Sequence, residues 1–323
     1  LAWEVVLTLS GRAERAEVVV TYEVGGCGWT PAWRVEALPG KGQVALTMEA
    51  EIVQSSGRTW DAPLRLATVP PVSRIDPPAL PEWIIQPRPE AAPLVATRAM
   101  KAMGEAMAPL PAPMQDNAPR ADYGAYAAYD LGRRSLEPGR AVRLPVLTHA
   151  AKAEFLHLVR PSRGPESWLR GLVTLDEAID LPQGPALFLV DGALAGEGAF
   201  GLQGREAEIF FGVDPLLRCT ARTQGKGSGE RGVFSKSQTH RWAWTFELAN
   251  SRKTPVKVRV EEPLPQPRDQ RIELTLTARP ETASRDKGLA VWELDVPASG
   301  SSVVSWEVGL TAPADLRLDL GWR

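Results

Sequence analysis

The stretch VALTMEAEI at residues 44–52 decides the fold class of this chain. Its apolar side chains occupy every second position: Val44, Leu46, Met48, Ala50 and Ile52. Polar residues lie between them: Thr47, Glu49 and Glu51. Successive side chains of a strand point to opposite faces of a sheet, so this alternation is typical of a strand with one buried and one solvated face. The stretch therefore predicts a half-buried β-strand.

The same alternation recurs along the chain, most clearly in WAWTFEL at residues 242–248. Further strands are predicted at residues 3–9, 17–24, 142–147, 154–159, 186–190, 206–211, 256–260, 272–277, 289–296 and 303–310. The 28 glycines and 29 prolines fall largely between these runs, where turns need them. No long segment shows a capped apolar stripe with a period of 3.6 residues. The sequence therefore predicts an all-β fold of antiparallel β-sandwich units.

One region breaks the pattern and suggests how the chain is divided. Residues 71–130 are rich in Pro, Ala and Met, and prolines remove the backbone donors that a central strand needs. We expect a flexible insert or linker there. The first β unit would then comprise residues 1–70 and 131–180. The second would comprise residues 181–323, with an immunoglobulin-like closing sandwich from Arg241 onward.

Composition excludes several classes of protein. The 323 residues carry 37 Lys plus Arg against 39 Asp plus Glu, a net charge of -2, which argues against nucleic-acid binding. No apolar run approaches the roughly 18 to 20 residues that span a bilayer. Because the chain starts at Leu1 rather than Met, we expect a processed or trimmed product whose preceding segment carried an export signal or an anchor.

Cysteine and histidine are too sparse to predict a metal centre. Cys27 and Cys219 lie far apart, which leaves open one long-range disulfide or two buried free thiols. The three histidines, His149, His157 and His240, match no metal-binding spacing. No cofactor is predicted.

Five tryptophans lie in or beside predicted turns and are the candidate binding residues: Trp29, Trp33, Trp60, Trp83 and Trp168. Two interpretations fit them. Each ring could be buried at the end of a sandwich, with its indole N–H bonded to a loop carbonyl. Alternatively, the rings could be exposed platforms for the apolar faces of a sugar.

Several acidic residues near strand ends are the candidates for chemistry. Asp191 precedes Gly192, a pair that fits a type I′ hairpin turn, and Asp214 precedes Pro215 in a turn whose aspartate would bond nearby amides. With Glu197, Glu261 and Glu262, these acids could converge as the carboxylate pair of a glycoside hydrolase or around calcium. Each also has a turn or surface explanation, so Asp191 and Asp214 are only weak metal candidates. No catalytic residue is predicted.

An ordered set of motifs resembles one known family. It comprises YEVGGCGWTPAW at 22–33, AEIVQSSGRTW at 50–60, LRLATVP at 64–70, LPQGPA at 181–186, VDGALAG at 190–196, FGVDP at 211–215, EEPLP at 261–265 and KGLAVW at 287–292. Together these resemble the C-terminal domain of the mucoidy inhibitor-like family, a domain of unknown function. The chain departs from the family pattern at Arg58 and Thr59, where an acidic pair is usual, and at Trp33, where Tyr is common.

The resemblance implies an exported or cell-envelope protein, linked to the mucoid exopolysaccharide phenotype and without established catalytic residues. It also implies an upstream coiled coil through which copies could associate. We therefore expect a non-enzymatic periplasmic or envelope module that binds a protein partner or a polysaccharide. The alternative is a carboxylate-based glycoside hydrolase or a calcium-dependent carbohydrate-processing domain.

Two structural features distinguish the binding hypotheses. A protein-binding module should show an exposed apolar patch or an unpaired sheet edge. A sugar-binding module should show two or more tryptophan rings lying flat and exposed in one groove.

Overall fold

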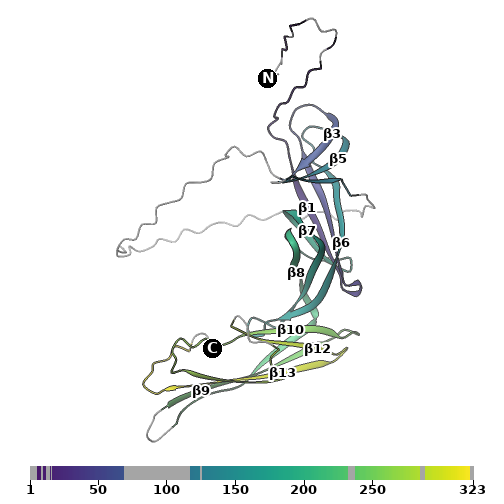
Figure 1. Cartoon of the computed structure of the whole chain (residues 1–323). Helices are drawn as coiled ribbons and strands as arrows, with labels where there is room; N and C mark the ends of the chain where they lie inside the picture. Colours follow the sequence, from purple (N-terminus) through teal and green to yellow (C-terminus); the bar gives the residue numbers. More distant parts are fainter. Residues whose placement is uncertain are drawn as a thin grey trace, which may run out of the picture.

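The computed structural model of the chain describes residues 6–8, 10–11, 15, 17–68, 117–123, 126–231, 237–283 and 288–320. Within them the regular structure is β apart from one 3₁₀ turn, η1 (Pro39–Lys41), which confirms the predicted all-β class. The strands are β1 (Gly28–Leu38), β2 (Gln43–Val53), β3 (Trp60–Ala67), β4 (Arg120–Tyr123), β5 (Tyr126–Leu136), β6 (Val142–Val159), β7 (Glu166–Val190), β8 (Ala193–Arg231), β9 (Ser237–Asn250), β10 (Val256–Pro263), β11 (Glu273–Arg279), β12 (Leu289–Val296) and β13 (Ser301–Pro313). The molecule is elongated, with β1 to β6 toward one end and β9 to β13 at the other (Figure 1).

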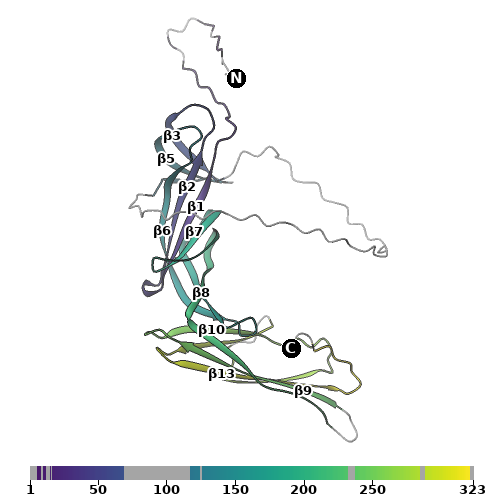
Figure 2. The ribbon, with the colours of Figure 1, turned by 180° about the vertical axis from the view of Figure 1, so that it is seen from behind.

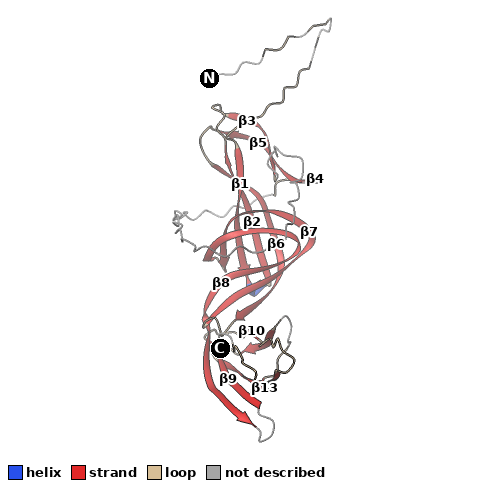
Figure 3. Cartoon of the chain, turned by 90° about the vertical axis from the view of Figure 1, so that its left-hand side faces the viewer, coloured by secondary structure: helices blue, strands red, loops and turns tan. Residues whose placement is uncertain are grey.

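The first unit is a closed ring of strands. β1 pairs with β2, β2 pairs with β6, and β6 pairs with the first half of β7, all antiparallel. β7 then bends through two register shifts and returns to pair in parallel with β1, joining Trp33–Ala37 to Ala186–Val190. Figure 3 shows β7 and β8 arching around β2 and β6. The alternating apolar residues of β1 and β2 point inward, and the five apolar side chains of residues 44–52 are buried as predicted.

A small sheet, in the order β3-β5-β4, packs against one end of this ring. Leu66 of β3 and Tyr129 of β5 belong to the same core as the ring. Residues 120–123 and 126–130 are therefore strands, whereas the composition predicted a flexible insert as far as residue 130. They pair because Thr68 and Pro119 also bond the backbone of β5 and hold it in place. The remainder of the predicted insert, residues 71–116, lies outside the described residues.

The second unit is a two-layer sandwich, visible from behind in Figure 2. One layer has the order β11-β13-β9-β8, and the other has the order β6-β10-β12. Its core is aromatic and brings Phe246, Trp292 and Trp306 together. The ring centroids of Trp292 and Trp306 lie 5.4 Å apart.

Long strands run from one unit into the other. β6 merges two strands that the sequence predicted separately, and β8 passes from the first core at Phe211 to the second core at Leu217. The division suggested by sequence places residue 181 in the second unit, but Leu181 and Phe200 pack in the first core. Most of the strand expected at residues 3–9 lies outside the described residues. The strand predicted at residues 17–24 is wrong: this segment is exposed and irregular, and no described strand pairs with it.

Candidate functional site

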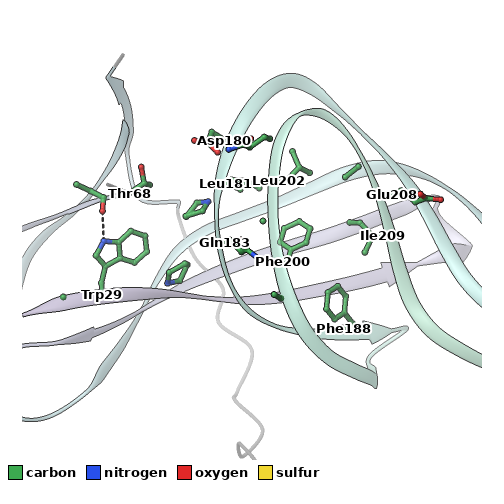
Figure 4. A pocket seen from close by; sticks show the side chains of 18 of the residues that line it. Trp29, Thr68, Asp180, Leu181, Gln183, Phe188, Phe200, Leu202, Glu208 and Ile209 are labelled. Carbon is green, nitrogen blue, oxygen red and sulfur yellow. Dashed lines mark hydrogen bonds between the residues drawn. The ribbon is translucent and has the colours of Figure 1, made fainter. Parts of the chain in front are cut away.

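The first unit contains a cavity of about 1210 Å³ where β1 and β7 separate. The two strands pair only from Trp33 onward on β1, and the unpaired residues Gly28, Trp29 and Pro31 line the cavity together with Asp180–Gln183 of β7. The end of β3 and two stretches of β8 complete the walls (Figure 4). The cavity thus follows from the bend in β7, which closes the ring over only half the length of β1.

Glycines allow the strands to cross closely at this bend. A Cβ atom on Gly184 would lie 2.1 Å from the backbone oxygen of Pro31, and one on Gly201 would lie 2.9 Å from Cα of Gln183. Both distances are too short for any other residue without a backbone shift. Glycine is therefore required at positions 184 and 201 for steric reasons.

Aromatic rings form part of the lining and are held in fixed positions. The indole N–H of Trp29 donates to the backbone oxygen of Ala67 at 2.8 Å, and the Trp29 ring meets Tyr129 edge to face at 6.4 Å. Phe200 lies 5.1 Å from Trp33, also edge to face. The aromatic wall is therefore formed before any ligand arrives.

The charged and amide side chains among the lining residues are carboxylates and amides. Asp180, Gln183, Gln203 and Glu208 are exposed and line the cavity, and no Lys, Arg or His is among the described lining residues. Glu208 forms a 2.7 Å salt bridge with Arg170, a residue that does not line the cavity. The cavity consequently favours a neutral or basic ligand over an acidic one.

The free edge of β8 borders the cavity. β8 pairs with β7 between Ala193 and Arg218 and with β9 only from Leu217 onward, so in the described chain Ala199–Phe210 has a strand on one side alone. Consecutive residues of β8, 199–203 and 207–210, line the cavity although their side chains alternate between faces. This is the arrangement expected where a strand presents its edge.

The structure separates the tryptophans that the sequence groups together. Trp29 lines the cavity, whereas Trp33 is buried behind the wall and donates its indole N–H to the backbone oxygen of Pro182 at 3.0 Å. Trp60 donates to Ser56 Oγ at 2.8 Å. Trp168 lies on the outer face of β7 with 44% of its surface exposed, and Trp83 is outside the described residues. Two exposed tryptophan rings do not share a groove in the described part of the chain.

Trp168 belongs to a separate apolar patch on the outer face of β7 and β8. Val213 lies opposite Trp168 in the register, and Phe210 lies opposite Arg170. Phe210 also lines the cavity, so this patch borders the candidate site. Its members are exposed apolar residues: Trp168, Leu172, Phe210 and Val213.

The two weak metal candidates have structural roles. Asp191 and Gly192 have φ angles of 46° and 85°, as the predicted type I′ turn requires. Asp214 Oδ1 accepts from the backbone N–H of Leu216 at 3.0 Å, which is the predicted turn bond. No group of three or more His, Cys, Asp or Glu side chains in the described ranges is placed to hold a metal ion.

Asp214 also forms a buried charge cluster that the sequence did not reveal. His157 Nε2 and Arg252 Nη1 each lie 2.5 Å from Asp214 Oδ2, from strand β6 and from the turn after β9. Burial by itself would raise the pKa of Asp214, but its contacts with His157 and Arg252 outweigh burial and hold the pKa well below its usual range. This cluster lies where β8 passes between the two cores.

Glu261 and Glu262, two of the other acids near strand ends, are bound by groups of the protein itself. Glu261 binds Arg160 and Arg259, and although burial opposes ionisation, these two arginines lower its pKa. Glu262 is fully buried and accepts from the backbone N–H of Ser162 at 2.6 Å. A glycosidase general acid needs a raised pKa, so the lowered pKa values of Asp214 and Glu261 give the hydrolase alternative no support.

Both cysteines are free thiols. Cys27 lines the cavity, and Cys219 is buried in the second core. Burial, with a smaller contribution from the Glu262 carboxylate, raises the pKa of Cys219 to about 12. Of the two arrangements that the sequence left open, the structure has unpaired thiols, of which only Cys219 is buried.

Sequence reasoning missed most of the lining, although a signal was present. Gly201 and Gly204 interrupt the strand pattern, and LPQGP at residues 181–185 interrupts it on the neighbouring strand. Glycine inside a strand often marks a bulge or a close approach of another backbone. These interruptions could have located the bend, but not the cavity it opens.

Comparisons with known proteins give a family and little else. The family model described as "Domain of unknown function (DUF4139)" matches residues 18–314. "Protein F37C4.5" of Caenorhabditis elegans is 23% identical over 299 residues, which cover 84% of this chain and 53% of that protein. The chain thus spans about half the length of this relative. No solved structure matches the chain. Among the described residues, no helix has the length and apolar character to cross a bilayer.

Proposed function

The chain belongs to the family described as a domain of unknown function (DUF4139), and we propose that it is a non-enzymatic protein-binding module. An extended segment of the partner would add as a strand to the free edge of β8. Its side chains would enter the cavity beside Trp29.

The unpaired edge at Ala199–Phe210 is the observation that carries this proposal. Backbone N–H and C=O groups along a free edge are ready to pair with an added strand, and neighbouring pockets then select side chains. The cavity supplies such a pocket, and the exposed patch around Trp168 extends the apolar surface beyond it. An unpaired edge and an exposed apolar patch are the two features that distinguish a protein-binding module from a sugar-binding one.

The lining indicates the chemistry of the bound segment. Phe188, Phe200 and Phe210 favour apolar side chains, while the carboxylate of Asp180 favours a Lys or Arg. We therefore expect an extended segment in which apolar residues alternate with at least one basic residue.

A polysaccharide is the second candidate ligand. Trp29 and the side-chain amides of Gln183 and Gln203 line one open cavity, and this combination of an aromatic face with amide groups suits sugar hydroxyls and C–H faces. The resemblance to the mucoidy inhibitor-like family supports this candidate, because it would link the module to exopolysaccharide in the cell envelope. We propose the periplasm or envelope as its location on the same ground.

Selection from a displayed peptide library tests the main proposal. Peptides that bind the wild-type chain should be extended, partly apolar and basic. Their binding should increase the hydrogen-exchange protection of amides in residues 199–210. Asp180→Lys should weaken their binding at least tenfold, because it reverses a charge in the lining.

Glu197→Lys is the matched control. Glu197 is also an exposed acid on the β7–β8 hairpin, but it lies outside the lining. Equal losses in both variants, or protection confined to another strand, would contradict the proposal. Binding of oligosaccharides from a glycan array, lost in Asp180→Lys while no peptide is selected, would favour the second candidate.

A further inference from the structure

Residues 17–24 are a strand-forming segment without a partner strand. Their sequence, EVVVTYEV, is rich in the β-branched residues that fit strands best. In the structure every residue of this segment is exposed and none is in a regular element, and no described strand pairs with it. Val19 and Tyr22 are 81% and 78% exposed. A segment of this kind is ready to pair with a free sheet edge.

The free edge of β8 is, conversely, an edge without a strand. Its first part, Ala199–Gln203, pairs with β7 on one side and with no described strand on the other. Phe200 and Leu202 are buried and lie on the cavity side (Figure 4), whereas Gly201 between them is exposed. A strand added here therefore needs apolar side chains at every second position.

Residues 19–23 match this stretch in an antiparallel register. Setting Tyr22 opposite Phe200 sets Val20 opposite Leu202, and directly opposed residues of antiparallel strands share one face. Val20 and Tyr22 would then face the cavity, while the residues between and beside them would face solvent. A shift by one residue would reverse every side chain, so the alternation specifies the face that is buried.

The charges of the two segments are complementary in the same register. Glu17 would lie beside Arg205, which is exposed on β8. Arg15 would continue past Gln203, which pairs with Asp180, toward the bend of β7. The exposed acids at this bend are Asp176, Glu177 and Asp180. Opposite charges would therefore meet at both positions.

The chain's own segment is too closely tethered to take this position. In this register Val24 would lie beside Gly198. Pairing through Ala186 of β7 aligns Gly198 with Trp33 of β1. The connection from Val24 to Gly28 would then have to cover roughly 16 Å along the strands alone. Four residues of extended chain span at most about 14 Å, so the segment has to come from another molecule.

We propose that residues 17–24 of a second copy of this chain bind as a strand to the free edge of β8, with Val20 and Tyr22 in the cavity. This assignment rests on the proposed function, because it uses the same edge and the same cavity. It identifies the partner as another copy of the chain.

Sedimentation equilibrium of the whole chain tests this proposal. We expect the average mass to rise above that of the monomer with concentration, and the hydrogen-exchange protection of residues 17–24 and 199–203 to rise with it. Val20→Pro removes a backbone donor from the segment and should weaken the association at least tenfold. Val6→Pro is the matched control, because Val6 is an exposed apolar residue outside the segment, and it should associate as the wild type does.

A synthetic peptide of residues 15–24 tests the edge separately. It should bind the Val20→Pro chain saturably and protect residues 199–203, whereas the same peptide with proline at position 20 should not bind. The proposal is overturned if the wild type stays monomeric at all concentrations, if Val20→Pro associates as the wild type does, or if the peptide does not bind.

Two further outcomes separate this proposal from the proposed function. Protection of residues 17–24 and 199–203 in a monomer, independent of concentration, would overturn the second copy as the donor. If the chain neither self-associates nor binds the 15–24 peptide while library peptides still protect residues 199–210, only the second-copy assignment fails. If no peptide of either kind protects this edge, both proposals fail.

Discussion

The two units have the same alternating sequence pattern but use their tryptophans differently. In the first unit, Trp29, Trp33 and Trp60 each donate the indole N–H to a backbone or hydroxyl oxygen. In the second, the rings pack on one another, as Trp244 does on Trp306 at 5.5 Å, and Trp292 also donates its indole N–H to a backbone oxygen. The first arrangement fixes loops and strand ends, whereas the second fills a core. A tryptophan count alone therefore does not predict a sugar site.

The cavity of the first unit and the groove of the second unit also differ in the groups that surround them. The cavity of the first unit is bordered by backbone edges and exposed acids, because a bent strand opens the ring there. The second unit has a groove of about 610 Å³ formed by β9, β11 and β13 and by residues 263–269 and 316–320, and its lining combines apolar side chains with Arg268, Asp269, Arg317 and Asp319. A free backbone edge suits an extended chain, whereas a groove lined by both apolar and charged side chains suits a ligand with both kinds of group. The comparison thus predicts different ligands for the two units.

Trp292→Ala should give the largest effect and shows whether the units unfold separately. Trp292 is fully buried, and its indole N–H donates to the backbone oxygen of Pro280 at 3.1 Å. We expect the free energy of unfolding of the second unit to fall by about 4 kcal/mol, the usual cost of removing a buried tryptophan side chain. Urea unfolding followed by thiol labelling of Cys219 measures it, because Cys219 lies in the same core.

In this variant the first unit should unfold at the same urea concentration as it does in the wild type. Circular dichroism of the strands then shows two steps where the wild type shows one. A single step shifted as a whole would mean that β6, β7 and β8 make the two units one cooperative body.

Asp214→Asn should have the next largest effect, because it breaks the cluster between the units. It leaves Arg252 without its carboxylate partner, and removing one member of a buried ion pair costs about 3 kcal/mol or more. The pKa of Asp214 is lowered by folding, so its contribution to stability is present above the ordinary value of 3.8 and is lost as the pH falls below it.

Thermal unfolding measured from pH 6 to pH 2 tests the sign of this effect. The wild type should lose stability on acidification below about pH 4, and Asp214→Asn should show a shallower loss. Parallel curves would assign the acid sensitivity to other carboxylates, such as Glu261.

Sequence predicted strands better than it predicted their connections. The alternation of β2, β9 and β13 reveals which face is buried, because that choice depends on adjacent residues only. It could not reveal that β8 serves both cores, since only residues 206–211 of this 39-residue strand have the predicted alternation. The failed prediction at residues 17–24 has the same cause: alternation indicates that a segment can pair, but not that a partner strand lies beside it.

The candidate sites were harder to predict for a related reason. The turn at Asp191 was predictable because its chemistry is local. The cavity joins Trp29 to Asp180 and Glu208, residues separated by the whole length of β2 to β6, and sequence carries no signal for that approach. His157, Asp214 and Arg252 likewise meet only through the sheet topology.

Gly184→Ala should have a moderate effect confined to the first unit. The new methyl group would approach the backbone oxygen of Pro31, so the ring has to loosen where β7 crosses β1. Overpacking of this kind costs about 2 kcal/mol. Gly196→Ala is the control, because a Cβ atom there meets nothing within 4 Å. Urea unfolding of both variants measures the difference, and equal stabilities would show that the ring is not tightly closed at Gly184.

Trp29→Phe should have the smallest effect. It tests whether the hydrogen bond of a tryptophan in the first unit contributes to stability. Phenylalanine keeps an aromatic face against Tyr129 but cannot donate to the backbone oxygen of Ala67, so we expect a loss of about 1 kcal/mol. Trp168→Phe, on the exposed outer face of β7, should change stability by less than about 0.5 kcal/mol. If both substitutions cost the same in urea unfolding, the Trp29 hydrogen bond does not hold the cavity wall. In that case the wall would depend on strand geometry alone, and the peptide bound at β8 would have to position the ring itself.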